Sequence, residues 1–243
     1  IYGAEYYRDW VDSSYRGYNA AGNLTSVRYQ GPVADNANYD LVGAFVENHL
    51  PLVEDRLELI LGGRFTHAAA DAAEVQDPFS GGRLSLSDSW DNAVGNARLS
   101  YQPGETKHWT IYGGASQGFR APNLSDLTRF DIARSGEQEI PAFGLKPESF
   151  LSPEVGVKME YGRFTAEAAY FYTFMDDLIV RVPTGAVTSN GDLIVNKENS
   201  GEGYVHGVEL AGSVKLHRDW TLWSNFTWMR GELDTPLVAG GAD

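Results

Sequence analysis

The sequence predicts an all-β protein, an antiparallel up-and-down transmembrane β-barrel of which this chain supplies about nine strands. Three observations predict it. Apolar and polar residues alternate with a period of two along much of the chain, which is typical of strands with two different faces. Short and long connections alternate between these strands. Aromatic residues gather at two levels along them, as they do at the two interfaces of a bilayer.

Composition and hydropathy exclude several classes of protein. The 243 residues include 33 acidic and 19 basic side chains, for a formal charge of −14, whereas a nucleic-acid partner would favour a basic surface. An aromatic content of 12% is too high for a disordered chain. No run of about 18 apolar residues indicates a transmembrane helix. A barrel strand needs only about 9–11 residues with one apolar face, so a membrane location stays open.

Alternation defines the individual strands. In RLELILGGRFTH, for example, Leu57 and Leu61 share one face, while Glu58 and Arg64 share the other. The same pattern recurs in EVGVKMEYG, FTAEAAYFYTF, GYVHGVELAGSVKL and WTLWSNFTWM. The predicted strands cover residues 1–9, 39–50, 57–69, 90–102, 109–119, 152–162, 163–180, 203–216 and 220–231.

The connections indicate which ends of the strands face which side of a membrane. Alternate connections are tight turns, with the sequences PLVEDR, PGETKH, YGR and HRD. The others are long and polar, covering residues 10–38, 70–89, 120–151 and 181–202. Loops beyond about 12–15 residues are uncommon in compact soluble domains. Short periplasmic turns opposite long extracellular loops are typical of an outer-membrane barrel. Asn190-Gly191 is a hairpin signal, so loop 181–202 is expected to continue as a β-ribbon above the membrane.

Aromatic residues fit two bilayer interfaces. One group lies beside the short turns and comprises Tyr101, Trp109, Tyr161, Phe164 and Trp220. A second group lies about a membrane thickness further along the strands and comprises Tyr172, Phe174 and Trp228. Between these levels we expect five residues to face lipid: Leu59, Val157, Tyr170, Leu210 and Phe226. A soluble β-sandwich or barrel is the alternative, in which this apolar face would be a dry core.

The predicted strand 109–119 leads into GFRAPN, which combines an aromatic residue, a fixed charge and a strand breaker. Pro122 ends ladder pairing because proline has no N–H to donate. We expect Phe119 at the membrane interface and Arg120 at the lumen or rim, where a charge can be solvated or paired. We interpret Arg120 as part of a structural ion pair at a loop base, and direct contact with a substrate is the alternative.

Three motifs, taken together, resemble the β-barrel of TonB-dependent outer-membrane receptors. They are the strand end GFRAPN, the run LKPE followed by E-x-G-x-K, and an asparagine followed by GVE, and they span about residues 109–231 in the family's order. Each motif alone is weak and the set is specific. The motif residues are Gly118, Phe119, Arg120, Ala121, Pro122, Asn123, Leu145, Lys146, Pro147, Glu148, Glu154, Gly156, Lys158, Asn199, Gly207 and Glu209.

The resemblance implies a Gram-negative outer-membrane receptor with a barrel of about 22 strands. In that family an N-terminal plug closes the barrel and couples it to the TonB complex, and the transported solute is scarce and large. A ferric siderophore is the expected ligand; cobalamin, haem, nickel chelates and oligosaccharides are alternatives. Residues 1–243 would be a partial barrel domain without the plug and the C-terminal strands. The expected partners are outer-membrane lipid, the TonB complex through the plug, and the ligand; the substrate-binding residues stay undetermined.

Other functions rank lower. A passive porin or adhesin-type barrel is the second hypothesis, and it needs neither plug nor energy coupling. Haem ranks low because no histidine lies between Phe119 and Leu145 and AFG replaces the asparagine-proline-leucine box of haem receptors. We expect no metal site and no cofactor, because the five histidines are scattered and the acidic loop residues Asp71, Glu74 and Asp77 lack calcium-loop spacing. The sequence contains no catalytic-nucleophile motif and no nucleotide-binding motif that would indicate an enzyme.

Topology predicts that the chain does not close on itself. With short turns on the periplasmic side, the first strand runs outward from the periplasmic end and the ninth also runs outward. Bacterial single-chain barrels have an even number of antiparallel strands, so an odd number cannot close in this way. We therefore expect an open, curved, meander-connected sheet.

Overall fold

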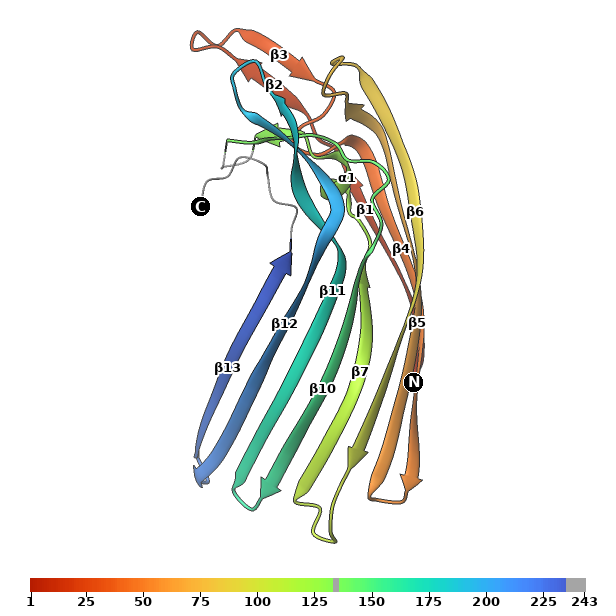
Figure 1. Cartoon of the computed structure of the whole chain (residues 1–243), viewed down its shortest axis with the longest axis vertical. Coiled ribbons are helices and arrows are strands. Elements are labelled where there is room, and N and C mark those ends of the chain that lie inside the picture. Colours follow the sequence, from red (N-terminus) through yellow and green to blue (C-terminus); the bar gives the residue numbers. More distant parts are fainter. Residues whose placement is uncertain (133–135, 235–243) are drawn as a thin grey trace.

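The computed structural model describes residues 1–132 and 136–234, and in this part the chain forms an open, curved antiparallel sheet (Figure 1). Its long strands follow one another as a meander with β1 at one edge and β13 at the other, so the sheet does not close into a barrel. The predicted fold class is therefore confirmed. The long strands are β1 (Tyr2–Val11), β4 (Asp35–Val53), β5 (Leu57–Gln76), β6 (Arg83–Tyr101), β7 (Trp109–Arg120), β10 (Glu148–Tyr161), β11 (Phe164–Val187), β12 (Leu193–His217) and β13 (Trp220–Asp234).

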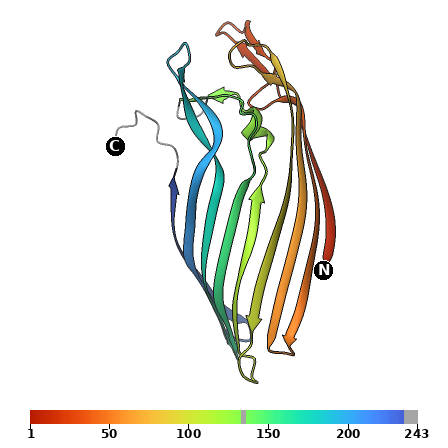
Figure 2. The same cartoon turned by 45° about the vertical axis from the view of Figure 1, so that its right-hand side comes forward.

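The four predicted tight turns lie together at one end of the sheet (Figure 2). They join β4 to β5, β6 to β7, β10 to β11 and β12 to β13. In the β10–β11 turn Gly162 has a φ of 58°, a conformation that glycine adopts without a steric penalty. By the membrane orientation inferred above, this is the periplasmic end and the opposite end is extracellular.

The strands extend further at the extracellular end than predicted. β5 continues to Gln76 and β6 begins at Arg83, so most of the predicted loop 70–89 is strand, and Asp71 and Glu74 lie in β5. The polar composition of this segment indicated a loop, but a ribbon above the membrane needs no lipid-facing apolar side. The ribbon expected for 181–202 is confirmed, and Gly191 in its turn has a φ of 88°.

Two extracellular segments contain elements that the alternation pattern did not predict. The segment 12–34 forms a two-stranded sheet of β2 (Tyr15–Tyr18) and β3 (Leu24–Arg28). The segment 121–147 contains helix α1 (Leu124–Thr128) and the short strands β8 (Asp131–Ile132) and β9 (Gln138–Glu139). A five-residue helix is too short to show periodicity. No helix within the described ranges is long and apolar enough to cross a membrane.

Strand β12 changes partner along its length. On one edge it pairs with β11. On the other edge it pairs with β13 from Glu202 to His217, and further up it pairs in parallel with β9 at Ile194 and Val195. Segment 121–147 is thereby joined to the wall of the sheet by backbone hydrogen bonding.

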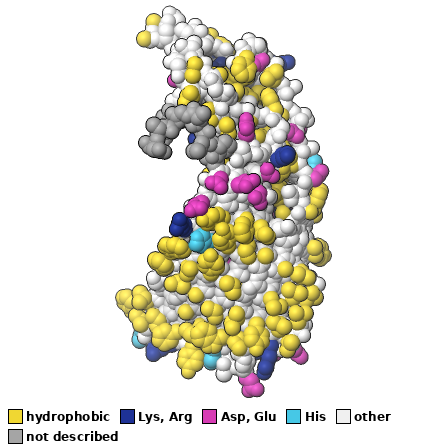
Figure 3. All heavy atoms as spheres, in the orientation of Figure 1, with side chains coloured by type: hydrophobic (Ala, Val, Ile, Leu, Met, Phe, Trp, Pro, Cys, Tyr) yellow, Lys and Arg dark blue, Asp and Glu magenta, His cyan; other side chains and the backbone are white. Residues whose placement is uncertain are grey.

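Register separates an apolar face from a polar face. One lateral row runs Leu59, Leu99, Gly113, Val155, Tyr170, Val208 and Trp228 across seven strands. The adjacent row holds Arg98, Gly114 and Glu154, and an ion pair of 3.0 Å joins Arg98 to Glu154 across the glycine. In Figure 3, apolar side chains cover the lower part of the visible face and acidic side chains gather above them.

The first strand begins partway up the sheet. β1 pairs with Ala37–Val46, the extracellular half of β4, and the N-terminal amine of Ile1 donates to the carbonyl of Glu47 at 2.8 Å. Its outward direction agrees with the prediction.

A small apolar cluster packs beneath the extracellular segments. Trp90 of β6 is nearly buried and its indole N–H donates to the carbonyl of Leu145 at 2.9 Å. Phe119, predicted at the membrane interface, is half-buried and packs against this cluster. The buried members are Ala34, Ala37, Ala68, Ala70, Ala72, Val75, Leu86, Trp90, Ala121, Leu124, Leu127, Ala142 and Leu145.

Candidate functional site at the extracellular rim

Arg120 is the centre of the strongest polar contacts at the rim. Its Nε and Nη2 donate to the two carboxylate oxygens of Glu148, both at 2.6 Å, and its Nη1 donates to Asp126 at 2.6 Å. A forked guanidinium–carboxylate pair of this kind is both strong and directional. The side chains of Glu148 and Asp126 are only 8% and 12% exposed. Arg120 thus makes the ion pair at a loop base that the sequence suggested.

The ion pairs continue beyond Arg120 into a chain of alternating charge. Lys197 of β12 lies 3.2 Å from Asp126 and 2.9 Å from Glu139, and Arg129 lies 3.6 Å from Glu139. Glu148, Arg120, Asp126, Lys197, Glu139 and Arg129 therefore form a charge-balanced series, which we call the rim ion chain. It connects β7, β10, α1, β9 and β12. Buried charges persist when they are paired in this way.

Local geometry places Asp126 in the rim ion chain. Asn123 caps α1: its side chain accepts the N–H of Asp126 at 2.9 Å, and the Asp126 carboxylate accepts the N–H of Asn123 at 3.2 Å. Burial by itself would raise the pKa of Asp126. The hydrogen bonds from Arg120 and the Asn123 backbone, together with the charge of Lys197, hold that pKa below its usual value.

Asn199 fixes the start of the LKPE motif. Its side-chain oxygen accepts the N–H of Lys146 at 2.7 Å, and its amide nitrogen donates to the carbonyls of Lys146 at 2.8 Å and Asp177 at 2.7 Å. Asp177 lies at a β-bulge of β11 with a φ of 55°. One amide thus joins β12, the irregular position of β11 and the segment just before β10.

The three predicted motifs therefore meet at one place. Arg120 and Asn123 come from the first motif, Lys146 and Glu148 from the second, and Asn199 from the third. Ala121 and Leu145 are buried in the apolar cluster, and Pro122 is fully buried where β7 ends. Gly118 pairs with Phe150 in the ladder just below, and Pro147 directly precedes β10. The residues of the three motifs therefore lie together where segment 121–147 is attached to the long strands of the sheet.

The rest of the second and third motifs lies lower, on the polar face. Gly156 sits under the ring of Tyr112, which a Cβ at this position would overlap. The guanidinium of Arg98 lies 4.5 Å from the centre of this ring, and Lys158 lies 5.5 Å from it. The phenol of Tyr112 donates to Glu167 at 3.0 Å. Register places Gly207 and Glu209 on the same face, in the rows of Glu154 and Gly156.

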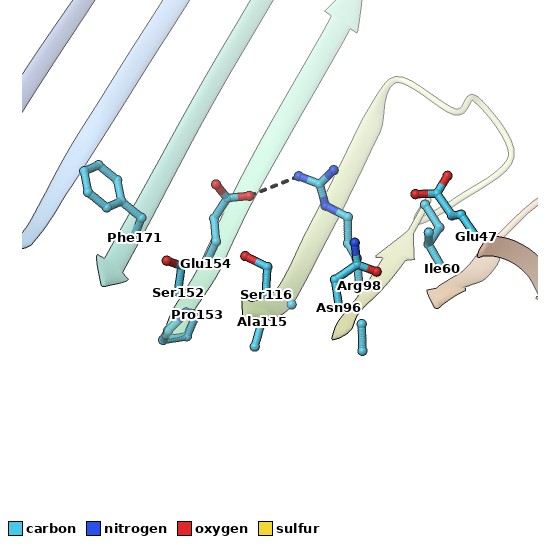
Figure 4. A pocket seen from close by; sticks show the side chains of 12 residues that line it. Glu47, Ile60, Asn96, Arg98, Ala115, Ser116, Ser152, Pro153, Glu154 and Phe171 are labelled. Atoms are coloured by element: carbon cyan, nitrogen blue, oxygen red, sulfur yellow. Dashed lines mark hydrogen bonds and ion pairs between the residues drawn. The ribbon is translucent and has the colours of Figure 1, made fainter. Parts of the chain in front are cut away.

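Beside these charges the polar face has an open hollow of about 410 Å³ (Figure 4). Arg98 and Glu154 point toward each other across it, with Ser116 between their strands. Polar groups predominate among the labelled residues: Glu47, Ile60, Asn96, Arg98, Ala115, Ser116, Ser152, Pro153, Glu154 and Phe171. No group of three or more metal-ligating side chains occurs in the part of the chain that the structure describes.

The five residues predicted to face lipid share the opposite face. Leu59 and Tyr170 belong to the apolar row described above, and Val157, Leu210 and Phe226 lie two positions from members of that row on their own strands. Tyr170, Leu210 and Phe226 are 42%, 44% and 59% exposed. Contact with lipid itself remains a proposal.

Sequence reasoning missed four of the six residues of the rim ion chain. Asp126, Lys197, Glu139 and Arg129 were not singled out, although Asp126 follows the Asn123 cap at the spacing of a capping box. Lys197 and Glu139 carried no such signal, since Lys197 lies far along the chain from Asp126 and Glu139, and Arg129, the other partner of Glu139, lies at the end of α1.

Comparison with known proteins agrees with this architecture. The family model "TonB dependent receptor-like, beta-barrel" matches residues 1–243. The chain belongs to this family. Its location is accordingly the outer membrane of a Gram-negative bacterium. Among curated relatives of this TonB-dependent receptor barrel, the iron-regulated outer membrane virulence protein of Vibrio cholerae is 30% identical over 142 residues, which cover 54% of this chain and 22% of the relative.

Solved structures show the same fold. The copper transporter OprC superposes with a TM-score of 0.67 at 18% identity, covering 95% of this chain and 35% of the transporter. The ferric yersiniabactin uptake receptor FyuA of Yersinia pestis gives a TM-score of 0.58 at 21% identity, covering 82% of this chain and 28% of the receptor. This TonB-dependent receptor barrel therefore spans only 22% of the curated relative's length and 35% or less of these two structures.

Proposed function

We propose that this chain is part of the wall of a receptor that takes up a scarce, large solute with energy supplied through TonB, and that the solute is a ferric siderophore. The family match along residues 1–243 is the observation that carries the proposal. The name of the Vibrio cholerae relative, which describes iron regulation, supports iron as the cargo. The titles of two similar folds name a ferric yersiniabactin uptake receptor and a siderophore receptor of Pseudomonas aeruginosa.

The two faces of the sheet support the parts that such a receptor requires. The apolar face suits outer-membrane lipid, because a charged residue there would cost about 2–4 kcal/mol near the midplane. The polar face, with Arg98, Glu154, Lys158 and Glu167 in ion pairs, suits a protein plug in the lumen better than an apolar ligand. In our proposal the plug carries the contact with the TonB complex and lies outside residues 1–243.

The proposal is tested with the full-length gene in a Gram-negative strain that lacks its own siderophore receptors. Cells are supplied with radioactive iron bound to a siderophore, with TonB intact or deleted. We expect iron uptake that requires both the receptor and TonB. Uptake that persists without TonB, and that extends to small unrelated solutes, would instead identify a passive porin. No uptake of any ferric chelate would contradict the siderophore assignment.

A further inference from the structure

The extracellular hairpin arm, residues 13–34 with strands β2 and β3, differs in charge from the rest of the molecule. Between Asp12 and Asp35, which flank its base, it contains Arg16 and Arg28 and no acidic residue, in a chain whose formal charge is −14. Three tyrosines, Tyr15, Tyr18 and Tyr29, accompany the arginines, and all three are exposed. A cationic, aromatic surface on an acidic protein favours an anionic partner, because the remaining surface repels one.

The hairpin arm is held firmly at its base. Gln30 is fully buried; its amide donates to the carbonyl of Thr128 in α1 at 2.7 Å and its oxygen accepts the N–H of Gln76 at 2.8 Å. The N–H of Ala34 donates to the Thr128 hydroxyl at 3.0 Å, and that of Phe130 donates to the carbonyl of Pro32 at 3.1 Å. The arm is therefore fixed to the segment that carries the rim ion chain.

Arg28 is positioned by aromatic rings. Its guanidinium carbon lies 4.2 Å from the ring centre of Tyr15 and 5.0 Å from that of Phe130, and the side chain is half-buried. Stacking of this kind orients the guanidinium plane and leaves its N–H groups available at the edge. Phe130 belongs to segment 121–147, so Arg28 joins the hairpin arm to that segment.

Arg28 also lacks the acidic partner that most extracellular cations have. Within the described ranges, no carboxylate pairs with Arg16, Arg28 or Lys146 at this end of the sheet. The paired cations at the same end are Arg8, Arg83, Arg120, Arg129, Arg181 and Lys197. An oriented guanidinium without a carboxylate can accept an anion from solution.

We propose that Arg28, with Tyr15 and Phe130, is a contact site for an iron chelate that is anionic and carries aromatic, phenolate-type iron ligands, such as a ferric catecholate. This inference rests on the proposed siderophore function and names its ligand class. Phenolate oxygens accept charge-assisted hydrogen bonds from the guanidinium edge, and the catechol rings stack on the tyrosine and phenylalanine rings. A neutral hydroxamate chelate offers neither the charge nor the rings.

The test uses the purified full-length receptor in detergent and two probes, a ferric tricatecholate and a ferric trihydroxamate. Affinity is measured by quenching of tryptophan fluorescence, with uptake assayed in the cells described above. We expect Arg28→Gln to weaken tricatecholate binding at least about tenfold, the effect of one charge-assisted contact. Arg28→Lys keeps the charge but loses the planar group that stacks on the rings. Its affinity for the tricatecholate should lie between those of Arg28→Gln and the unmodified receptor. Added salt should weaken binding to the unmodified receptor more than to Arg28→Gln.

Arg163→Gln is the matched control, because it removes one cation without a carboxylate partner at the opposite end of the sheet and should leave affinity unchanged. Equal tricatecholate affinity of Arg28→Gln and the unmodified receptor would overturn the inference. Preferential, TonB-dependent uptake of the trihydroxamate would also overturn it while leaving the proposed function intact. Failure to take up either chelate would count against the proposed function itself, and the inference would fall with it.

Discussion

The side-chain amide of Asn199 spans the backbone of Lys146, 53 residues away in the chain, by accepting its N–H at 2.7 Å and donating to its carbonyl at 2.8 Å. A second N–H of the amide reaches the carbonyl of Asp177 at 2.7 Å. An aspartate has the same shape but no N–H to donate. Asn199→Asp should therefore destabilise this joint by about 1–3 kcal/mol, the cost of two carbonyls left without their donor.

The measurement for Asn199→Asp is the rate of proteolysis of segment 121–147 in intact cells. We expect faster cleavage in Asn199→Asp than in the unmodified receptor. Asn190→Asp, at the tip of the β11–β12 ribbon, is the control and should leave the rate unchanged. Equal rates for all three proteins would show that Asn199 does not hold the segment.

Removal of Arg120 should be far more damaging than removal of an exposed arginine. Arg120→Met leaves Glu148 and Asp126 as nearly buried carboxylates without their main partner, at an expected cost of about 2–4 kcal/mol. Arg218, 84% exposed in a periplasmic turn, pairs with Asp219 and should contribute less than about 1 kcal/mol. The free energy of unfolding in urea, measured in detergent micelles, gives the cost of Arg120→Met and of a matching substitution of Arg218. Adding Glu148→Gln to Arg120→Met should recover part of the loss, and an additive further loss would argue against direct coupling.

The five residues proposed to face lipid should be sensitive to charge. Arginine at Leu59, Val157, Tyr170, Leu210 or Phe226 should lower barrel stability by about 2–4 kcal/mol near the bilayer midplane. Ser116→Arg on the polar face is the control.

Because the chain has no cysteine, single cysteines at the same positions can carry spin labels. The labels should be accessible to a lipid-soluble quencher and not to a water-soluble one, and the reverse pattern would indicate a soluble protein with this face as its core.

Gly156 should tolerate a side chain only when Tyr112 is removed. Gly156→Ala places a methyl group into the Tyr112 ring, so the ring and the cations stacked on it must move, at about 1–3 kcal/mol. Tyr112→Ala in the same protein provides the missing space. We therefore expect the alanine at residue 156 to be nearly neutral in the Tyr112→Ala background when unfolding is measured in urea. An equal cost in both backgrounds would mean that the glycine is required for another reason.

The rim ion chain should weaken only in acid. The pKa of Asp126 lies below its usual value of 3.8, so this carboxylate contributes stability above that pH and loses it as the pH falls through the lower folded pKa. A spin label at Phe143, an exposed residue of segment 121–147, reports the mobility of the segment. Its mobility should stay constant from neutral pH to about pH 4 and rise below it. Asp126→Asn should raise mobility at neutral pH, and a transition near pH 6 would point to a different titrating group.

Period-two alternation predicted the long strands because each has one face in an apolar environment. It worked for Val155, Val157 and Met159, whose neighbours on the polar face are charged or glycine. It failed above the membrane, in Ala70 to Gln76 of β5 and again around Leu84 and Leu86 of β6. The buried face of β5 there consists mostly of alanines, such as Ala70 and Ala72, whose small side chains give only a weak alternation signal.

The motifs predicted where segment 121–147 is attached to the sheet, but the sequence did not show which contacts hold it there. Arg120 and Glu148 belong to different motifs, and a fixed charge beside a strand breaker was enough to suggest an ion pair. Lys197 could not be found in this way, because an isolated lysine in a polar ribbon resembles any solvated side chain. Its contacts with Asp126 and Glu139 follow from the parallel pairing of β9 with β12, a non-local event that no local pattern encodes.

The partner change along β12 has a mechanical consequence. This single strand of 25 residues runs about 80 Å from the periplasmic turn to the extracellular tip. Its lower edge is stiffened by β13 and its upper edge carries β9. A force applied at the tip is therefore transmitted along one continuous backbone, and a displacement of β12 also moves segment 121–147, which is paired to it through β9.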